Sequence, residues 1–393
     1  MIYRLDPEYV GFPNPEEAEP EGLIAIGGDL KPKRLLEAYC SGIFPWYNEG
    51  EPILWWSLDP RMVLPVADFQ PRKSLQRVVR SGRFEVRIDT CFEEVMRSCG
   101  STVREGQDGT WVTEEMVEAY VQLHKMGFAH SFETFLDGEL VGGLYGESIG
   151  DWFFGESMFH LVSDASKVAF CRMIDFCRMH GLRMVDAQQE TKHLFSLGAR
   201  PIPRSDYLQQ LYAMPQDRTL RYYWRNNSVA LLLGGNQGNV ELIMDLAVEM
   251  LEDELGYVCL ESSFYETEPW GDFAEENPQP FLNKAIVVDT DLPASEVLRH
   301  VLEIEARLGR SRNPEAQGYT SRPIDIDLIF YNTQVVSDPS LTLPHPRMHL
   351  RRFVLEPLAE IIPGYVHPQF KKTVVQLLAE CPDTSVIRKL AES

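Results

Sequence analysis

The sequence predicts two α+β domains joined by a short linker. At 393 residues the chain is long for one hydrophobic core, because single cores rarely grow beyond about 250 to 300 residues. Helix and strand patterns occur in both halves, and they lapse between 215 and 227, where we place the linker. The aromatic residues of this linker can dock on one domain, so the segment need not be wholly flexible. We therefore expect a small N-terminal subdomain at 1–62, a first main domain at 63–214 and a second at 228–393.

The first half combines strand and helix patterns after an irregular start. Residues 1–62 are rich in Pro, Gly and Trp, so we expect them to be irregular. Asp137-Gly138 is typical of a two-residue hairpin turn, and Gly181 is typical of a helix end. The predicted elements are strands at 128–135, 139–145 and 152–154, a helix at 164–180 and a strand at 183–188. The order strand, helix, strand predicts a β-α-β unit.

The second half predicts a mostly antiparallel sheet with helices packed on it. Gly256 and Gly309 mark the ends of two helices. The predicted elements are strands at 229–233, 257–265 and 285–289, a helix after Gly238 that ends near Leu255, a helix at 293–308, a strand through Asp325 and Asp327, and a helix at 373–379.

Composition excludes several classes of protein. The formal net charge is -22 and both halves are acidic, so nucleic acid would have to bind a local basic patch. No apolar run approaches the roughly 18 residues that cross a membrane, and residues 1–6 lack a signal-peptide pattern. We therefore expect a cytoplasmic protein with no membrane partner. The 7 cysteines contain no Cys-x-x-Cys pair, which argues against a disulfide framework or a zinc ribbon.

Asp325 and Asp327 form the most informative pattern in the second half. Side chains alternate along a strand, so the two carboxylates share one face while Ile324, Ile326 and Leu328 pack behind them. This arrangement suits Mg²⁺, which takes few protein oxygens and leaves its other positions to water and substrate phosphates. A lone Asp-x-Asp is more often an exposed edge or a turn, so the surrounding residues must decide between the two interpretations.

Glu156, Asp186 and Gln188 form a separate group in the first half. Asp186 and Gln188 are two residues apart on a predicted strand, which places a carboxylate beside an amide on one face. Such a pair can orient an attacking amine and accept its proton during acyl transfer. The alternative is that all three are structural hydrogen-bonding residues.

The basic segment at 72–83 is the best local candidate for contact with a nucleic-acid backbone. Lys73, Arg77 and Arg80 fall on one helical face, at steps of four and three residues. The alternative is a solvated helix face. Trp46 and Trp111 are candidates for stacking on an unpaired terminal base, although each tryptophan by itself is more typical of a core.

Residues 10–212 resemble the leucyl/phenylalanyl-tRNA-protein transferases. The motifs that carry the resemblance are Phe12-Pro13, Gly22-Leu23-Ile24-Ala25-Ile26-Gly27-Gly28-Asp29-Leu30, Tyr39 with Gly42-Ile43-Phe44-Pro45-Trp46, Leu54-Trp55-Trp56-Ser57, Gly109-Thr110-Trp111-Val112-Thr113, Gly155-Glu156-Ser157-Met158-Phe159 and Ser196-Leu197-Gly198-Ala199. The resemblance implies a GNAT-like acyltransferase fold. It also implies transfer of Leu or Phe from aminoacyl-tRNA to acceptor proteins that begin with Arg or Lys, which marks them for degradation.

The same resemblance implies roles for individual residues. Glu156 would engage the basic N-terminal residue of the acceptor, and Asp186 and Gln188 would assist its α-amine. Trp46 and Trp111 would hold the terminal adenosine. By analogy and by hydrophobicity, we expect the pocket for the transferred amino-acid side chain to comprise Phe153, Met158, Phe170, Met173 and Val185.

Residues 229–380 resemble the 6-hydroxymethyl-7,8-dihydropterin pyrophosphokinases of folate synthesis. The motifs are Ser262-Ser263-Phe264-Tyr265-Glu266-Thr267-Glu268-Pro269-Trp270-Gly271, Phe281-Leu282-Asn283, Glu305-Ala306-Arg307-Leu308-Gly309-Arg310-Ser311-Arg312, the Asp325/Asp327 strand and Leu343-Pro344-His345-Pro346. The resemblance implies a ferredoxin-like α+β sandwich and two Mg²⁺ ions held by Asp325 and Asp327. The implied reaction transfers pyrophosphate from ATP to 6-hydroxymethyl-7,8-dihydropterin and releases AMP.

The implied substrate sites of this second domain involve many side chains. The pterin site would comprise Thr267, Pro269, Phe281, Asn283 and Phe353. The ATP site would comprise Glu305, Arg310, Arg312, Arg322, His345 and Arg351, of which Arg310 and Arg322 would also act in catalysis by meeting the charge of the transferring group. The chain departs from the family's commonest pattern at Gly235, Phe281, Pro346 and 317–321. These departures leave undecided which loop side chain closes over the pterin.

Both constellations together predict a bifunctional transferase. The alternative for the first domain is a module that binds tRNA or N-terminal degrons without catalysis, and for the second a pterin- or nucleotide-binding module. We expect the two domains to fold independently and not to channel substrates, because their substrates share no intermediate.

Overall fold

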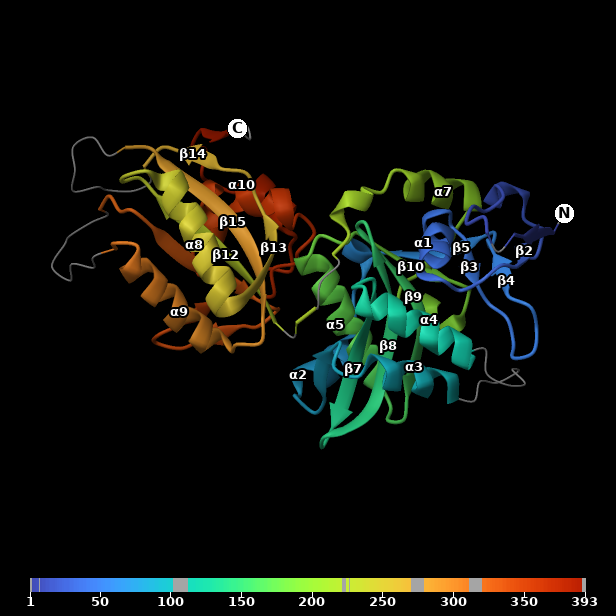
Figure 1. Cartoon of the computed structure of the whole chain (residues 1–393). Coiled ribbons are helices and arrows are strands. Elements are labelled where there is room, and N and C mark those ends of the chain that lie inside the picture. Colours follow the sequence, from blue (N-terminus) through green and yellow to red (C-terminus); the bar gives the residue numbers. More distant parts are fainter. Residues whose placement is uncertain are drawn as a thin grey trace. The chain divides into compact units, whose positions relative to one another are not determined.

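The computed structural model describes residues 2–6, 8–101, 112–220, 224–225, 227–269, 279–310 and 320–390. It divides the chain into two compact units. The first comprises Met1–Cys177 and Leu182–Trp224, and the second comprises Arg178–Gly181 and Arg225–Ser393. Each unit has its own sheet with helices (Figure 1). The mixed α+β class that the sequence predicts is confirmed.

The N-terminal part of the first unit is more regular than we expected from its composition. It forms a four-stranded sheet in the order β1-β2-β4-β3, packed with one helix. The elements are β1 (Tyr3–Leu5), β2 (Leu23–Gly27), β3 (Phe44–Pro45), β4 (Leu54–Trp56) and α1 (Pro32–Cys40). Strands of two to five residues are too short to show an alternating pattern, which is why the sequence did not reveal them.

The main sheet of the first unit has seven strands in the order β11-β5-β10-β9-β8-β7-β6. Their bounds are β5 (Arg61–Pro65), β6 (Glu85–Ile88), β7 (Ala129–Leu136), β8 (Glu139–Ile149), β9 (Trp152–His160), β10 (Met184–Gln188) and β11 (Arg200–Ile202). The β7–β8 hairpin turns at Asp137 and Gly138, which have φ of 53° and 86°. The predicted two-residue turn is therefore confirmed, since a type I′ turn needs positive φ at both positions.

Helices cover both faces of this sheet. On one face, α3 (Phe92–Ser101) and α4 (Glu114–Lys125) pack on a core that includes Tyr145 and Phe154. On the other, α2 (Lys73–Arg80) and α5 (Ala165–Met179) pack on a core that includes Leu144 and Phe153. Adjacent residues of β8 and of β9 thus serve opposite cores, as strand geometry requires. Strand β9, helix α5 and strand β10 form the predicted parallel β-α-β unit. Two short helices follow, α6 (Lys192–Ser196) and α7 (Arg204–Tyr212).

Part of the predicted linker packs on the first unit. Trp224 is 4 % exposed and stacks on the His130 ring, with 3.6 Å between ring centroids, and on the Phe176 ring at 4.2 Å. Leu220 packs at the edge of the same core, and the backbone N–H of Gly150 donates to Thr219 Oγ1 at 2.8 Å. Residues 219, 220 and 224 therefore belong to the first unit by packing.

The second unit contains an antiparallel sheet in the order β16-β12-β15-β14-β19, with β13 also paired to β15. The strands are β12 (Asn227–Gly235), β13 (Gly256–Glu261), β14 (Tyr265–Thr267), β15 (Phe281–Thr290), β16 (Asp325–Tyr331) and β19 (Ile387–Lys389), and a separate pair is formed by β17 (Val336–Ser337) and β18 (Thr342–Leu343). The expected strand at 257–265 is divided in two. At the break, Ser262 Oγ replaces a backbone carbonyl by accepting from the N–H of Ala285 at 2.9 Å.

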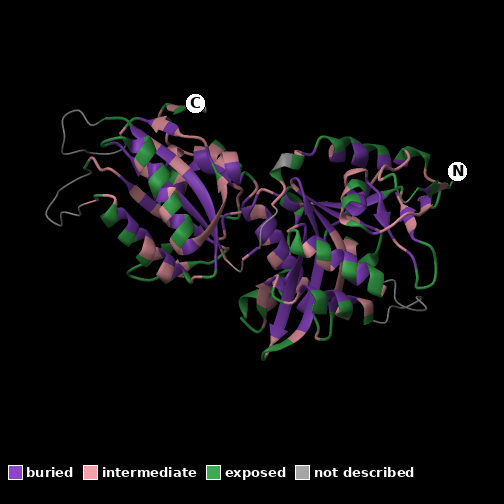
Figure 2. Ribbon diagram, in the orientation of Figure 1, coloured by how far each residue is buried: buried purple, intermediate pink, exposed green. Residues whose placement is uncertain are grey.

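Both faces of this sheet are also buried (Figure 2). Helices α8 (Val240–Leu255) and α9 (Ala294–Arg307) cover one face, and α10 (Arg352–Ile361) and α11 (Val374–Ala379) cover the other. Val229, Leu231 and Leu233 face the first pair, whereas Ala230 and Leu232 face the second. This explains the unbroken apolar run at 229–233. The predicted helices ending near Leu255, at 293–308 and at 373–379 are confirmed, while α10, which contains Pro357, was not predicted.

Two expectations from composition can be compared with the structure. No helix among the described residues is long and apolar enough to cross a membrane. All seven cysteines are free of disulfide bonds.

We predict that Trp224→Ala destabilises the first unit by about 3 to 5 kcal/mol, the usual cost of truncating a buried Trp to Ala. Hydrogen exchange followed by mass spectrometry of the full chain measures this loss in peptides from β7 and α5. Peptides from β12 should keep their protection. Tyr212→Ala, at a side chain that is 61 % exposed, is the control; equal protection in the two variants would contradict the packing role of Trp224.

Candidate active sites

Glu156 enters the interior of the first unit through an irregularity in β9. Gly146 of β8 pairs with Gly155, and Tyr145 pairs with Ser157, so Glu156 is the extra residue of a β-bulge. Such bulges redirect a side chain. A Cβ atom at Gly146 would lie 2.1 Å from the carbonyl oxygen of Phe154, so only glycine fits there. The bulge therefore depends on Gly146.

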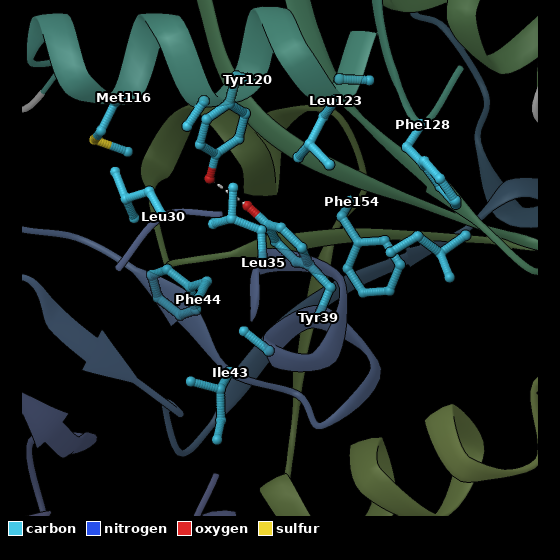
Figure 3. Packing of buried hydrophobic residues seen from close by; sticks show 14 of the residues in the cluster. Leu30, Leu35, Tyr39, Ile43, Phe44, Met116, Tyr120, Leu123, Phe128 and Phe154 are labelled. Carbon is cyan, nitrogen blue, oxygen red and sulfur yellow. Dashed lines mark hydrogen bonds between the residues drawn. The ribbon is translucent and has the colours of Figure 1, made fainter. Parts of the chain in front are cut away.

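The Glu156 carboxylate is held by side chains from three elements. Gln188 Nε2, at the end of β10, donates to Glu156 Oε1 at 2.6 Å. The Tyr39 hydroxyl, from α1, donates to the same oxygen at 2.8 Å. Tyr39 is also hydrogen-bonded to the hydroxyl of Tyr120, from α4, at 2.5 Å (Figure 3). Glu156 thus has a fixed position in a largely apolar surrounding.

Burial changes the protonation of Glu156. Loss of water raises the pKa of its carboxyl to about 7, although hydrogen bonds from Tyr39 and Gln188 act in the opposite direction. The negative charge of Asp186 adds to the increase. Near neutral pH this carboxyl is therefore close to its own pKa, which is the range in which a group responds to an incoming charge or proton.

Asp186 is fully enclosed and ion-paired. Its oxygens accept from Arg61 Nε at 2.9 Å and Arg61 Nη2 at 2.7 Å, from the Tyr207 hydroxyl at 2.7 Å and from the backbone N–H of Gln188 at 2.9 Å. Gln188 has φ of 55°. Asp186 is 0 % exposed. Asp186 therefore holds the side chain of Arg61 and the backbone of Gln188 in place.

A cavity of about 460 Å³ opens beside Glu156 and Gln188. Its walls include Trp46 and all five residues that we expected to select the amino-acid side chain: Phe153, Met158, Phe170, Met173 and Val185. Asp186 is not among the described residues that line it. The structure therefore joins an apolar pocket to a carboxyl-amide pair, as acyl transfer between an apolar donor group and an amine requires.

The predicted tRNA contacts divide into three groups. Trp46 is half-buried, packs against Trp56 with ring centroids 5.7 Å apart, and reaches the cavity wall. Lys73, Arg77 and Arg80 lie exposed on α2, whose buried side is formed by Leu75. Trp111 lies outside the described residues.

Sequence reasoning missed several side chains of this site. Tyr39 belongs to a motif that carries the family resemblance, but its contact with Glu156, 117 residues away, was not predicted. Arg61 lies 125 residues from Asp186, and its contact was not predicted either. Phe44 and His193 also line the cavity. The motif Gly42-Ile43-Phe44-Pro45-Trp46 was the available signal for Phe44.

In the second unit, Asp325 and Asp327 lie on β16 as expected. Ile324, Ile326 and Leu328 are buried in the core behind them, and both carboxylates line a second cavity of about 490 Å³. Asp325 is ion-paired with Arg310, and Arg322 Nη2 lies 2.8 Å from its Oδ2. No hydrogen bond or ion pair of Asp327 occurs among the described residues, so its oxygens remain available in the cavity.

Glu305 supports the aspartate strand from α9. It is 1 % exposed, is ion-paired with Arg310, and accepts from the backbone N–H of Ile326 at 2.8 Å. This N–H belongs to Ile326, the residue between the two aspartates. Glu305 therefore fixes the strand that carries them, and it also lines the cavity.

The expected pterin residues gather at one part of this cavity, with one exception. Asn283 is buried, and its Nδ2 donates to Thr267 Oγ1 at 2.9 Å. Phe281 and Phe353 line the cavity, and the guanidinium groups of Arg322 and Arg351 lie 5.7 and 5.6 Å from their respective ring centroids. Pro269 is not among the lining residues that the structure describes.

The remaining expected nucleotide residues also reach the cavity. Arg310, Arg322, His345 and Arg351 line it, whereas Arg312 lies outside the described residues. Burial lowers the pKa of His345, with Arg351 and Arg347 acting in the same direction and Asp327 opposing them. Sequence reasoning missed the further lining residues Leu298, Leu302, Ser340, Leu341, Thr342 and Arg347.

Gly235, one departure from the family pattern, has a steric cause. A Cβ atom at this position would lie 2.4 Å from the carbonyl oxygen of Pro323. The backbone of β12 thus passes so close to the segment before β16 that a side chain at position 235 would fit only if one of these two backbone segments shifted.

Comparisons with known proteins match the two units to different families. The model of the "Leucyl/phenylalanyl-tRNA protein transferase" family matches 63–212, and the model of its N-terminal domain matches 28–59. The model described as "7,8-dihydro-6-hydroxymethylpterin-pyrophosphokinase (HPPK)" matches 230–363.

Curated relatives support the first match. A leucyl/phenylalanyl-tRNA–protein transferase of Anaeromyxobacter sp. (strain Fw109-5) is 53% identical over 223 residues, which cover 57% of this chain and 94% of the relative. One of Desulfatibacillum aliphaticivorans is 50% identical over 223 residues, covering 57% and 95%.

Solved structures resemble the chain only slightly. An HPPK-DHPS crystal structure in complex with substrates has 17% sequence identity and a TM-score of 0.31, and covers 39% of this chain. A Plasmodium falciparum HPPK-DHPS variant has 20% identity and a TM-score of 0.32. The chain spans only 42% and 45% of the length of these two solved chains.

Both matched families are families of enzymes, and each covers the unit whose residues pointed to it. The chain therefore belongs to the leucyl/phenylalanyl-tRNA–protein transferase family through its first unit and carries an HPPK domain in its second, which makes it a bifunctional transferase.

Proposed function

We propose that the first unit, with a GNAT-like fold, transfers Leu or Phe from aminoacyl-tRNA to proteins that begin with Arg or Lys. The observation that carries this proposal is the cavity that joins five apolar pocket residues to Glu156 and Gln188. An apolar side chain suits the pocket, and a cationic side chain suits the carboxyl. Trp46 at the cavity wall is positioned for the terminal adenosine, and the exposed Lys73, Arg77 and Arg80 are the candidates for backbone phosphates.

The amide of Gln188 is oriented for the attacking amine. Its Nε2 donates to Glu156, so its Oε1 is left to accept a hydrogen from the α-amine of the acceptor. The amine nitrogen then bonds to the ester carbonyl carbon, the bond from that carbon to the ribose oxygen breaks, and the proton of the amine ends on the ribose oxygen. Asp186 takes part by holding the Gln188 backbone N–H, which positions the amide.

We predict that acceptor affinity depends on the ionisation of Glu156. A protonated carboxyl has no charge to offer a cation, so the KM for an Arg-starting peptide should rise as pH falls below about 7, by about tenfold for each pH unit once Glu156 is mostly protonated. Steady-state transfer assays from pH 5.5 to 8 measure this. Glu156→Gln should give a high KM with a smaller pH dependence; identical pH profiles would refute the role of Glu156.

A second prediction separates the two residues of β10. Asp186→Asn should destabilise the first unit by about 3 to 5 kcal/mol, because Arg61 is left with an uncompensated buried charge. Gln188→Ala should keep the fold and lower kcat by roughly 10²-fold. Urea unfolding and transfer of labelled leucine to an Arg-starting peptide test both statements. Normal transfer by Gln188→Ala would exclude its role, and tRNA binding without transfer by the wild type would favour a noncatalytic module.

For the second unit, we propose a ferredoxin-like domain that transfers pyrophosphate from ATP to 6-hydroxymethyl-7,8-dihydropterin. The observation that carries this proposal is the cavity in which Asp325 and Asp327 face Arg310, Arg322 and Arg351. Carboxylates beside arginines fit a polyphosphate with its metal ions.

Two Mg²⁺ ions would be held by Asp325 and Asp327, because paired carboxylates on a cavity wall are the hard oxygen ligands that this ion prefers. When bound, Mg²⁺ supplies charge neutralisation at the phosphates. The chain's own residues bind and orient the substrates. Arg310 and Arg322 are positioned to exchange their contacts with Asp325 for phosphate oxygens, and the amide of Asn283 is positioned for the polar edge of a pterin between Phe281 and Phe353.

We predict that Asp327→Ala lowers pyrophosphoryl transfer by several orders of magnitude while the melting curve is unchanged, since Asp327 has no structural partner among the described residues. AMP release at varied Mg²⁺ concentration measures the effect, and excess Mg²⁺ should not restore it. Asp291→Ala, at an exposed aspartate of the same unit, is the control. Near-normal turnover by Asp327→Ala would overturn the assignment.

A further inference from the structure

Glu147 of β8 is a buried acid that the proposed mechanism does not use. It is 0 % exposed. Neither carboxyl oxygen has a hydrogen-bond partner, and no ion pair of this residue occurs, among the residues that the structure describes. Burying a carboxyl without partners is unfavourable by several kcal/mol, and such a group in a native interior calls for an explanation.

The titratable groups around Glu147 come from four elements. They are Tyr39 of α1, Tyr120 of α4, Tyr145 of β8 itself and Glu156 of β9. The Tyr39 hydroxyl lies close to Glu147 but is already bonded to Glu156 and to Tyr120; the bond to Tyr120 is drawn in Figure 3. Arg61, a cation that acts on Glu156, is itself bonded to Asp186. The two carboxyl groups therefore lie close together, and the nearby guanidinium of Arg61 is paired with Asp186 and with neither of them.

We propose that Glu147 is a positioning residue that makes the acceptor site select a cation, because its carboxyl supplies a second negative charge behind Glu156 when an Arg or Lys side chain binds. This inference rests on the proposed function of the first unit. The ligand it specifies is an acceptor whose first residue carries a guanidinium or an ammonium group.

The electrostatics of an empty and an occupied site differ. Without a cation, burial and the charge of Glu156 raise the pKa of Glu147 well above its usual range, although the hydroxyl of Tyr39 acts in the opposite direction, and this favours the protonated form. A bound guanidinium favours loss of that proton to solvent, and the resulting carboxylate attracts the cation through a medium of low dielectric constant. An uncharged first residue induces no such ionisation. The site thus becomes more negative only for the acceptor that carries a positive charge.

Glu147→Gln tests the proposal, because glutamine keeps the shape and removes the ionisation. The substrates are peptides that begin with Arg or with citrulline, which has nearly the same shape and no charge. We expect the Arg-to-citrulline ratio of kcat/KM to fall about tenfold through a higher KM for the Arg peptide. The kcat and the KM for aminoacyl-tRNA should stay unchanged, and Glu147→Asp should restore part of the ratio.

Glu133→Gln is the matched control. Glu133 is also buried in this sheet, but it is hydrogen-bonded to Thr90 and Ser131. Like Glu147, it is not among the described residues that line the cavity, and its carboxyl differs in having these hydrogen-bond donors. Its replacement should leave the ratio unchanged. If Glu156→Gln lowers the ratio and Glu147→Gln does not, this inference fails and the proposed function stands. If neither variant lowers it, the assigned role of Glu156 fails as well.

A measurement on the wild type keeps the proposal open to refutation should Glu147→Gln not fold. At pH 8, Glu156 is already mostly ionised. Calorimetry in two buffers of different ionisation enthalpy should then show more protons released on binding the Arg peptide than the citrulline peptide, since the α-amine contributes equally to both. Equal proton release at pH 8 would overturn the inference.

Discussion

The buried ion pair between Arg61 and Asp186 is the interaction on which the first active site depends. It joins β5 to β10, and the Arg61 guanidinium also lies 4.7 Å from the Phe44 ring centroid and 4.8 Å from that of Tyr207. Removing two charges from water is costly unless every oxygen finds a donor. Here the donors are Arg61, Tyr207 and the N–H of Gln188. The last bond holds Gln188 at positive φ and directs its amide to Glu156.

The two units use opposite electrostatic arrangements. In the first, carboxyl groups lie in an apolar region, where loss of water raises the pKa of Glu156 into the neutral range. In the second, Arg310 and Arg322 compensate the negative charge of Asp325, and bound phosphates and metal ions would balance the remaining charges. The first arrangement suits recognition of a cation and the second recognition of a polyanion. An acidic chain with a net charge of -22 can therefore serve both, because each site sets its own local charge.

Local patterns predicted most of the secondary structure, and the family resemblances indicated many of the residues that line the cavities, but neither predicted the contacts between distant segments. The hairpin at Asp137-Gly138 needs only the chemistry of its own two residues, so the sequence was sufficient. The five apolar pocket residues lie on β9, α5 and β10, one continuous β-α-β unit, and were also predicted. The contacts of Tyr39 with Glu156 and of Arg61 with Asp186 could not be predicted, because each joins residues more than a hundred positions apart. The short N-terminal strands were not predicted, because strands of two to five residues are too short to show an alternating hydrophobic pattern.

Trp224 shows why a domain boundary cannot be read from composition alone. The sequence predicts a linker at 215–227 whose aromatic residues can dock on one domain, and Trp224 fills a space between His130 and Phe176 in the core that also contains Phe153. Phe153 in turn lines the cavity. A fragment cut at residue 217 would expose this side of the core and leave the wall of the amino-acid pocket without support. The boundary that preserves the site therefore lies after Trp224, where packing on the first unit ends.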